Sequence, residues 1–87
     1  MPSPRSVTVT VRFLARYSEL VGRETVTISA PDPATVDSIL ARLGEVVPEA
    51  RRLTAKPLCA HNFRQVRGTE SVADGDEIAL LPPMAGG

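Results

Sequence analysis

Residues 7–30 read VTVTVRFLARYSELVGRETVTISA, and the spacing of the apolar residues changes twice within this stretch. In residues 7–13 apolar side chains alternate strictly with polar ones, which predicts a half-buried strand. From residue 14 the apolar residues recur at spacings of three and four as far as Gly22, a common helix stop, which predicts a helix of about two turns. The alternation returns in residues 24–30. The stretch therefore predicts two strands joined by a short helix.

The main helix is expected directly after this stretch. Prolines at positions 31 and 33 break the second strand, because proline lacks an amide donor and restricts the residue before it. Thr35 is a favourable N-cap for a helix that starts at Val36, and the charge of Asp37 suits the positive end of the helix dipole. Gly44 is expected to end the helix. Its apolar stripe consists of Val36, Ile39, Leu40 and Leu43.

Shorter patterns fill the second half of the chain. Residues 48–53 predict one more helical turn, residues 58–62 and 65–67 predict two strands, and residues 77–81 (EIALL) predict a last strand. The sequence Asp74-Gly75-Asp76 is typical of a tight turn. Two strands, a helix and then returning strands predict an α+β sheet with one face covered by the helix. We expect the first and last strands to lie side by side in its middle.

Length and composition limit the classes of function. The 87 residues predict a single domain, residues 1–87, with a disordered N-terminal tail at 1–6 and a flexible C-terminal tail at 82–87. A net charge of zero and 3% aromatic residues argue against a nucleic-acid-binding protein. Cys59 is the single cysteine and cannot form an internal disulfide, which favours a cytoplasmic location. No apolar run is long enough for a membrane span, and no signal peptide is recognisable.

Few side chains offer chemistry of their own. Cys59 could be the nucleophile of a small transferase, but the sequence shows no base for it, and a cysteine in a strand is usually a buried apolar residue. His61 has no cysteine, histidine or paired carboxylate at ligand spacing, so no metal site is expected. Arg51, Arg52 and Lys56 are expected on a solvated face. The sequence therefore predicts a protein that is not itself an enzyme.

The chain ends with Pro82-Pro83-Met84-Ala85-Gly86-Gly87. A proline pair favours extended geometry and projects the following residues away from the domain. Glycine has no side chain, so Gly86 and Gly87 would let the main chain enter a narrow channel. This pattern suits delivery of the terminal carboxylate into the active site of another protein. An ordinary frayed end is the alternative interpretation.

Both ends of the chain resemble one known family. Residues 74–87 (DGDEIALLPPMAGG) are similar to the ending of the ubiquitin-like β-grasp sulfur carriers of the ThiS/MoaD type. The similarity is greatest to the small subunits of molybdopterin synthase, in which a proline pair precedes two residues and Gly-Gly. Residues 11–24 (VRFLARYSELVGRE) resemble the first strand, short helix and turn of that family, and residues 33–36 resemble the start of its main helix. The resemblance implies a ubiquitin-like β-grasp, a mixed sheet with one main helix packed on one face.

The resemblance also implies a function. An E1-like adenylyltransferase would use ATP to convert the Gly87 carboxylate into an acyl-adenylate, and a sulfur donor would turn this into a thiocarboxylate. Gly86 would pass through the activating site as bare backbone. The tail would then enter the large, catalytic subunit of molybdopterin synthase and supply sulfur for the molybdopterin dithiolene in molybdenum cofactor biosynthesis. The chain would be a non-catalytic subunit of a heterotetramer and would bind no cofactor, since ATP is used by the activating partner.

Alternatives within and outside the family stay open. Carriers for thiamine thiazole or cysteine synthesis share the fold and the Gly-Gly ending. Thiazole carriers usually lack the proline pair, so Pro82-Pro83 favours the molybdopterin pathway. Outside the carriers, the chain could be a ubiquitin-like adaptor or a modifier conjugated to lysines. A modifier would form isopeptide adducts, whereas a carrier would hold sulfur at its terminus.

Strand alternation predicts a surface for the partner. If Val7, Val9, Val11 and Phe13 face the helix, Leu14 begins on the opposite side of the sheet, and Ala79 and Leu81 of the last strand face the same way. These three residues would form an apolar patch beside the tail. The expected partner-binding residues are Leu14, Ala79, Leu81, Pro82, Pro83, Met84 and Ala85.

Charge adds a second, independent clue. Residues 70–87 contain acidic but no basic side chains, at Glu70, Asp74, Asp76 and Glu77. Such a segment would suit a basic groove on a partner, mainly by accelerating association. For Asp74 and Asp76, ordinary turn chemistry is the favoured interpretation.

Overall fold

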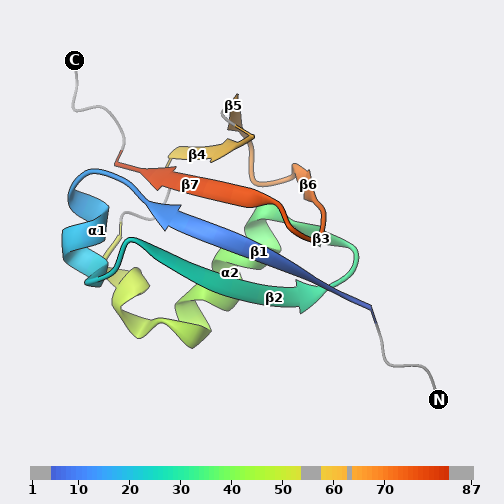
Figure 1. The fold of residues 1–87 in the computed structure, drawn as a ribbon, viewed down its shortest axis with the longest axis horizontal. Coiled ribbons are helices and arrows are strands. Elements are labelled where there is room, and N and C mark those ends of the chain that lie inside the picture. Colours follow the sequence, from blue (N-terminus) through green and yellow to red (C-terminus); the bar gives the residue numbers. More distant parts are fainter. Residues whose placement is uncertain (1–4, 54–57, 63, 83–87) are drawn as a thin grey trace.

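The computed structural model describes residues 5–53, 58–62 and 64–82. The elements are β1 Ser6–Phe13, α1 Arg16–Val21, β2 Thr25–Pro31, β3 Ala34–Thr35, α2 Val36–Val46, the 3₁₀ helix η1 Pro48–Arg52, β4 Leu58–His61, β5 Arg64–Val66, β6 Ser71–Val72 and β7 Glu77–Leu81. Five strands form one sheet in the order β2-β1-β7-β4-β5, and β3 pairs with β6 separately. The helix α2 crosses one face of the main sheet, and α1 lies at its end (Figure 1).

The first and last strands occupy the middle of the main sheet. β1 and β7 run parallel, with Val11 opposite Ile78 and Phe13 opposite Leu80. The other pairs, β1 with β2, β7 with β4 and β4 with β5, are antiparallel. A parallel neighbour requires a crossover connection, and here the chain makes it through α2. The predicted α+β sheet with adjacent first and last strands is confirmed.

The core lies between the sheet and α2. Val9 and Val11 of β1 and Ile78 and Leu80 of β7 are completely buried, and so is Ile39 of α2. Burial of an aliphatic side chain of this size contributes about 1.5–3 kcal/mol to folding. The predicted inward face of β1 and the predicted stripe of α2 are therefore confirmed, with Leu40 at the edge of the core and only partly buried.

The start of α2 follows the sequence expectation. Thr35 is the N-cap, and its side-chain oxygen accepts a hydrogen bond from the amide of Ser38 at 3.3 Å. In return, the Ser38 hydroxyl accepts from the amide of Thr35 at 2.8 Å. This capping box satisfies two amides that the helix cannot pair internally.

The predicted end of α2 at Gly44 is wrong, because the helix continues to Val46. The amide of Val47 still donates to the carbonyl of Leu43, at 2.8 Å. Val47 is 2% exposed, so the additional turn brings an apolar side chain into the core. Pro48, which disfavours helical geometry in the residue before it, then ends the helix.

The short elements agree with their sequence patterns. α1 ends at Gly22, whose φ of 86° is the left-handed conformation that glycine adopts at little cost. Gly75 has a φ of 89° in the predicted turn between β6 and β7. η1 coincides with the helical turn predicted at residues 48–53. Over the described residues, no helix combines the length and the apolar character that a membrane span requires.

Two features were not predicted. The expected disordered tail at residues 1–6 is wrong for its last two residues, because Ser6 belongs to β1 opposite Pro31 and the Arg5 carbonyl accepts from the Asp32 amide at 3.0 Å. The rest of that predicted tail, residues 1–4, lies outside the described residues. The pair of β3 and β6 was missed, because a strand of two residues contains no periodicity to detect. This small pair ties the start of α2 to the segment that leads into β7.

Candidate docking face and tail exit

β7 leads from the centre of the sheet to the C-terminal tail. Its last residue, Leu81, pairs with Leu58 of β4, and the Leu14 amide donates to the Leu80 carbonyl at 3.0 Å. Pro82 is the last described residue. The other tail residues singled out from the sequence lie outside the described residues, so their roles stay predictions; they are Pro83, Met84, Ala85, Gly86 and Gly87.

A groove of about 520 Å³ lies beside the end of β7, and we call it the helix-free groove. Ala79 and Leu81 line it because the residues that alternate with them, Ile78 and Leu80, point into the core against α2. Leu14 lines the same groove. The structure therefore brings together the three apolar residues that alternation predicted on this face. The described residues that line it are Arg12, Leu14, Ala60, Asn62, Glu77, Ala79 and Leu81.

The part of the groove that β4 supplies was not predicted. Ala60 lies directly opposite Ala79 in the β4–β7 register, so both small side chains reach the same face. Asn62 follows β4 with a φ of 55°, a left-handed conformation that asparagine tolerates better than most residues. These β4 residues could not be predicted from the sequence, because the periodicity of a strand does not show which other strand it pairs with.

Arg12 and Glu77 form an ion pair at the rim of the helix-free groove. Nε of Arg12 lies 3.2 Å from one carboxylate oxygen of Glu77, and its second nitrogen lies 3.3 Å from the other. The hydrogen bond to Glu77 raises the pKa of Arg12 above its ordinary value. Both side chains are close to half exposed. The groove therefore combines an apolar floor with a neutralised pair of charges at its edge.

At the opposite end of β7, His61 lies between two carboxylates. Its Nε2 is 2.6 Å from an oxygen of Asp76, and its Nδ1 is 3.3 Å from an oxygen of Glu70. Ionised carboxylates only accept hydrogen bonds, so both ring nitrogens donate when His61 is an imidazolium. Burial opposes that charge, but the two carboxylates outweigh it and raise the pKa of His61. We call these three residues the His61 clamp.

The clamp was not predicted, because the sequence shows no paired carboxylate at ligand spacing from His61. Glu70 and Asp76 are nine and fifteen residues away along the chain. The pairing of β4 with β7 brings Asp76, which directly precedes β7, next to His61, and Glu70 approaches from the segment before β6. The Ala73 amide donates to Asp76 at 2.8 Å and lowers the pKa of that carboxyl group. Among the described residues, no group of three or more histidine, cysteine, aspartate or glutamate side chains is placed to hold a metal ion.

The acidic segment is largely occupied within the chain itself. Asp74 accepts a hydrogen bond from the Thr8 amide at 2.7 Å, and Asp76 accepts from the Ala73 amide within its turn. The predicted turn is therefore confirmed, but its carboxylates also bind elsewhere in the fold, Asp74 at Thr8 and Asp76 at His61. Glu77 is paired with Arg12. The fit of this segment to a basic groove on a partner stays a prediction.

Cys59 and the basic residues 51, 52 and 56 were the remaining candidates from the sequence. Cys59 is 6% exposed on the α2 side of β4, and burial raises the pKa of its thiol. A buried, protonated thiol is a poor nucleophile, as the sequence pattern led us to expect. Arg51 and Arg52 are exposed, and Nε of Arg51 donates to the Gly44 carbonyl at 3.1 Å. Lys56 lies outside the described residues.

Comparison with known proteins provides the family context. Residues 11–87 match the family model described as the ThiS family. The molybdopterin synthase sulfur carrier subunit of Aedes aegypti is 34% identical over 92 aligned residues, which cover 98% of this chain and 94% of that protein.

Solved structures agree with the fold. Small archaeal modifier protein 1 of H. volcanii is 26% identical with a TM-score of 0.79, covering 90% of this chain and 99% of that one. A chain in the complex of subunits 1 and 2 of molybdopterin-converting factor from Helicobacter pylori is 27% identical with a TM-score of 0.69, covering 93% and 100%. Ubiquitin of Caldiarchaeum subterraneum shares the fold alone, at 18% identity and a TM-score of 0.63. The ubiquitin-like β-grasp is therefore the fold of this chain.

Proposed function

The chain belongs to the ThiS family, and from this we propose that it is a sulfur carrier, the small subunit of a molybdopterin synthase. In this proposal the carboxylate of Gly87 receives sulfur as a thiocarboxylate and gives it to the dithiolene of molybdopterin. The Aedes aegypti relative, named as a sulfur carrier subunit of that enzyme, supports the proposal over nearly the full length of both chains. The chemistry would take place on the main chain, so this chain needs to supply no catalytic side chain.

The observation that carries the proposal is the position of the tail exit. β7 is anchored between β1 and β4, and the helix-free groove opens beside its last residues, Ala79 and Leu81. A partner seated on this groove would hold the origin of the tail in a fixed place. The five residues after Pro82 would then reach at most about 17 Å into that partner. Docking and delivery would thus be performed by adjacent parts of the chain, the end of β7 and the residues that follow it.

The proposed cycle has three chemical steps. An E1-like adenylyltransferase joins the Gly87 carboxylate to the α-phosphate of ATP, and pyrophosphate leaves. A sulfide-level sulfur donor attacks the acyl carbon, AMP leaves, and a thiocarboxylate remains. In the large subunit the sulfur passes to the molybdopterin precursor, and water returns an oxygen to Gly87. The structure of the Helicobacter pylori complex of subunits 1 and 2 supports a protein partner for a chain of this fold.

Intact-mass spectrometry tests the proposal. The chain is incubated with an E1-like adenylyltransferase, ATP and a sulfur donor, and the C-terminal peptide is then sequenced by fragmentation. We expect a gain of about 16 Da at Gly87, because sulfur replaces one oxygen. Oxidation of Met84 would add a similar mass to the same peptide, but iodoacetamide alkylates a thiocarboxylate and does not alkylate methionine sulfoxide. Alkylation of Cys59 does not interfere, because a C-terminal peptide that starts after Arg67 lacks that residue.

Deletion of Gly87 is the matched control and should abolish the mass change. A product joined to lysine side chains through Gly87 would instead support a modifier, the function for which the H. volcanii neighbour is named. No change at Gly87 under any activating condition would contradict both proposals and leave a ubiquitin-like adaptor. Transfer of the sulfur to a thiazole or cysteine precursor, and not to the molybdopterin precursor, would keep the carrier and change its pathway.

A further inference from the structure

The outer edge of β2 is an open edge of the main sheet. β2 is the first strand in the order β2-β1-β7-β4-β5, so within the described part of the chain only one of its two sides is paired. Its partner β1 lies opposite it in a register that runs from Ser6 opposite Pro31 to Arg12 opposite Thr25. Open edges are commonly protected by charged residues, a bulge or proline. Here only Pro31, at the end of the strand, gives such protection.

The hydrogen-bonding pattern identifies the free groups on this edge. The Phe13 amide donates to the Glu24 carbonyl at 2.8 Å, and the Asp32 amide donates to the Arg5 carbonyl at 3.0 Å. In an antiparallel pair, residues that exchange such bonds alternate with residues whose amide and carbonyl groups point outward. Glu24 and Asp32 therefore face β1, and so do the even-numbered residues between them. The amide and carbonyl groups of Thr25, Thr27 and Ser29 point away from β1. Three amides and three carbonyls therefore face away from β1.

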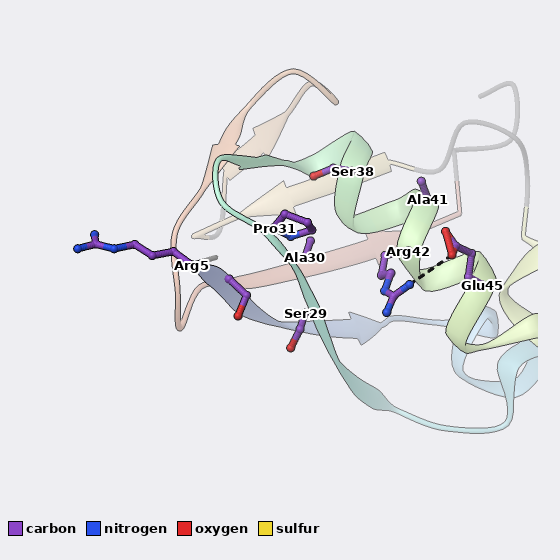
Figure 2. A pocket seen from close by; sticks show the side chains of 9 residues that line it. Arg5, Ser29, Ala30, Pro31, Ser38, Ala41, Arg42 and Glu45 are labelled. Atoms are coloured by element: carbon purple, nitrogen blue, oxygen red, sulfur yellow. Dashed lines mark hydrogen bonds and ion pairs between the residues drawn. The ribbon is translucent and has the colours of Figure 1, made fainter. Parts of the chain in front are cut away.

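A hollow of about 570 Å³ lies next to this edge, between β2 and α2. Figure 2 shows Ser29, Ala30 and Pro31 on the strand side and Ala41 and Arg42 among the residues on the helix side. Ala30 is buried, whereas Ala41 and Arg42 are exposed. We call this hollow the β2–α2 groove. A strand added to β2 would direct every second side chain into it.

The charges at the β2–α2 groove favour an acidic occupant. Its lining contains two arginines, Arg5 and Arg42, against a single carboxylate, Glu45. Glu45 is already paired with Nη1 of Arg42 at 3.3 Å. The guanidinium has five donors, so Arg42 keeps others for a second carboxylate. Small, apolar side chains at Ala30 and Ala41 leave room for residues such as valine or isoleucine.

We propose that the β2 edge and the β2–α2 groove form a second binding site, which takes an extended, acidic peptide segment of a partner protein as an additional strand. Main-chain bonds to Thr25, Thr27 and Ser29 would supply affinity, and alternate apolar residues of the peptide would enter the groove. Carboxylates next to these residues would meet Arg42 and Arg5.

The site is independent of the proposed sulfur-carrier function, and both surfaces can be occupied together. β1 separates β2 from β7, which at about 4.8 Å per strand spacing places the two strands about 10 Å apart. Since β2 runs antiparallel to β1 and β7 runs parallel to it, Pro31 lies at the end of the sheet opposite to Leu81. In Figure 1 the arrowhead of β2 and the end of β7 accordingly lie at opposite ends of the sheet. A protein bound at β2 would leave the tail accessible.

Peptide selection tests the proposal even though the partner is unidentified. A phage library of random dodecapeptides is selected on the full chain, and the best peptide is titrated against the wild type, Ala41→Glu and Leu20→Glu. Ala41→Glu adds bulk and negative charge to the groove, whereas Leu20→Glu adds the same charge at an exposed position of α1. We expect acidic peptides with alternating apolar residues, with binding weakened about tenfold or more by Ala41→Glu alone.

Backbone methylation distinguishes strand addition from simple occupation of the groove. Two versions of the selected peptide are N-methylated at alternate residues, one at odd and one at even positions. A strand pairs through one edge only, so one version should lose about tenfold in affinity or more and the other should bind nearly normally. Amide shifts at Thr25, Thr27 and Ser29 locate the peptide.

Four results would overturn the proposal. They are the absence of any enriched peptide, equal binding to Ala41→Glu, equal tolerance of both methylation patterns, and pairing of two copies of this chain through β2 in sedimentation experiments. The proposal would be established if Ala41→Glu weakens peptide binding and if only one of the two N-methylated peptides loses affinity. Either set of results leaves the mass measurement at Gly87 unaffected, so the two proposals succeed or fail separately.

Discussion

At its N-terminal end β7 starts beside the His61 clamp, whereas at its C-terminal end it passes the helix-free groove and leads into the tail. At the first end, the charges of His61, Glu70 and Asp76 are paired with one another within the chain. At the second, the half-buried side chains of Leu14 and Leu81 line an open groove. The same strand therefore has one end whose polar groups are satisfied internally and one end whose apolar surface is left for a partner. Substitutions at the clamp should affect stability, and substitutions at the groove should affect binding.

Removal of residues 83–87 should have the largest effect on function and almost none on stability. The pairing of β7 with its neighbours ends at Leu81, so the truncated chain keeps every described strand contact. We expect sulfur transfer to fall below detection, because the proposed acceptor carboxylate of Gly87 is lost. Transfer assays with the large subunit and thermal unfolding measure the two properties side by side. A large fall in the unfolding temperature would contradict the separation of body and tail.

Leu81→Glu should weaken binding to the large subunit by about tenfold or more, equivalent to about 1.4 kcal/mol. The substitution introduces a charge into the apolar floor of the helix-free groove, where it would be buried on docking without a partner. Titration calorimetry measures the affinity, and circular dichroism checks the fold. Leu20→Glu, an exposed leucine of α1 that is 39% accessible, is the matched control. Equal affinities for the two variants would remove the groove from the interface.

The sequence was most informative where neighbouring residues determine the structure. Alternation in β1 and β7 and the N-cap at Thr35 predicted the elements and the faces of their side chains, because each depends on residues a few positions apart. The apolar patch of Leu14, Ala79 and Leu81 required one further assumption, that the first and last strands are neighbours. The end of α2 was misplaced because Gly44 is a local stop signal, whereas the burial of Val47 in the core is a tertiary effect.

The parts of the site that sequence could not predict depend on register between distant strands. Ala60 joins the groove only because it lies opposite Ala79, and His61 meets Asp76 only because β4 pairs with β7. A single residue of slip would move Ala60 to the other face. Cross-strand neighbours of this kind become visible once the order β2-β1-β7-β4-β5 is known.

His61→Gln should lower stability by an amount that depends on pH. The folded-state pKa of His61 is raised above 6.5, so its contribution is complete below the unfolded-state value and is lost as pH rises through the folded-state value. Near pH 5.5 the loss should be on the order of 1–2 kcal/mol, since a buried donor to two carboxylates is removed. The pKa of Asp76 is lowered, so that carboxylate stays ionised there. Urea unfolding at about pH 5.5 and pH 9 measures the difference.

The control for this prediction is Arg64→Gln. Arg64 lies 3.7 Å from Glu70 but is largely exposed, so its removal should change stability little at either pH. Binding of the large subunit should be the same for His61→Gln and the wild type once both are folded. A stability difference that grows with rising pH would show that His61 is neutral in the folded protein and would contradict the clamp.

Substitution of the Arg12–Glu77 pair should have the smallest effect on stability. It tests whether this pair belongs to the part of β7 that stabilises the fold or to the part that binds the large subunit. A double-mutant cycle with Arg12→Ala and Glu77→Ala measures the coupling free energy of the pair in unfolding. This coupling should be weaker than that of His61 with Asp76, because water screens an exposed pair.

Stopped-flow measurement of association with the large subunit tests the role of the pair at the groove rim. Rim charges act mainly on association rates and their salt dependence. If the pair belongs to the binding end, each single substitution changes the association rate while the unfolding temperature stays near that of the wild type. The opposite result would be a coupling free energy as large as that of His61 with Asp76, together with an unchanged association rate. In that case the pair would serve stability, and the predicted docking residues would be Leu14, Ala79 and Leu81 without the pair.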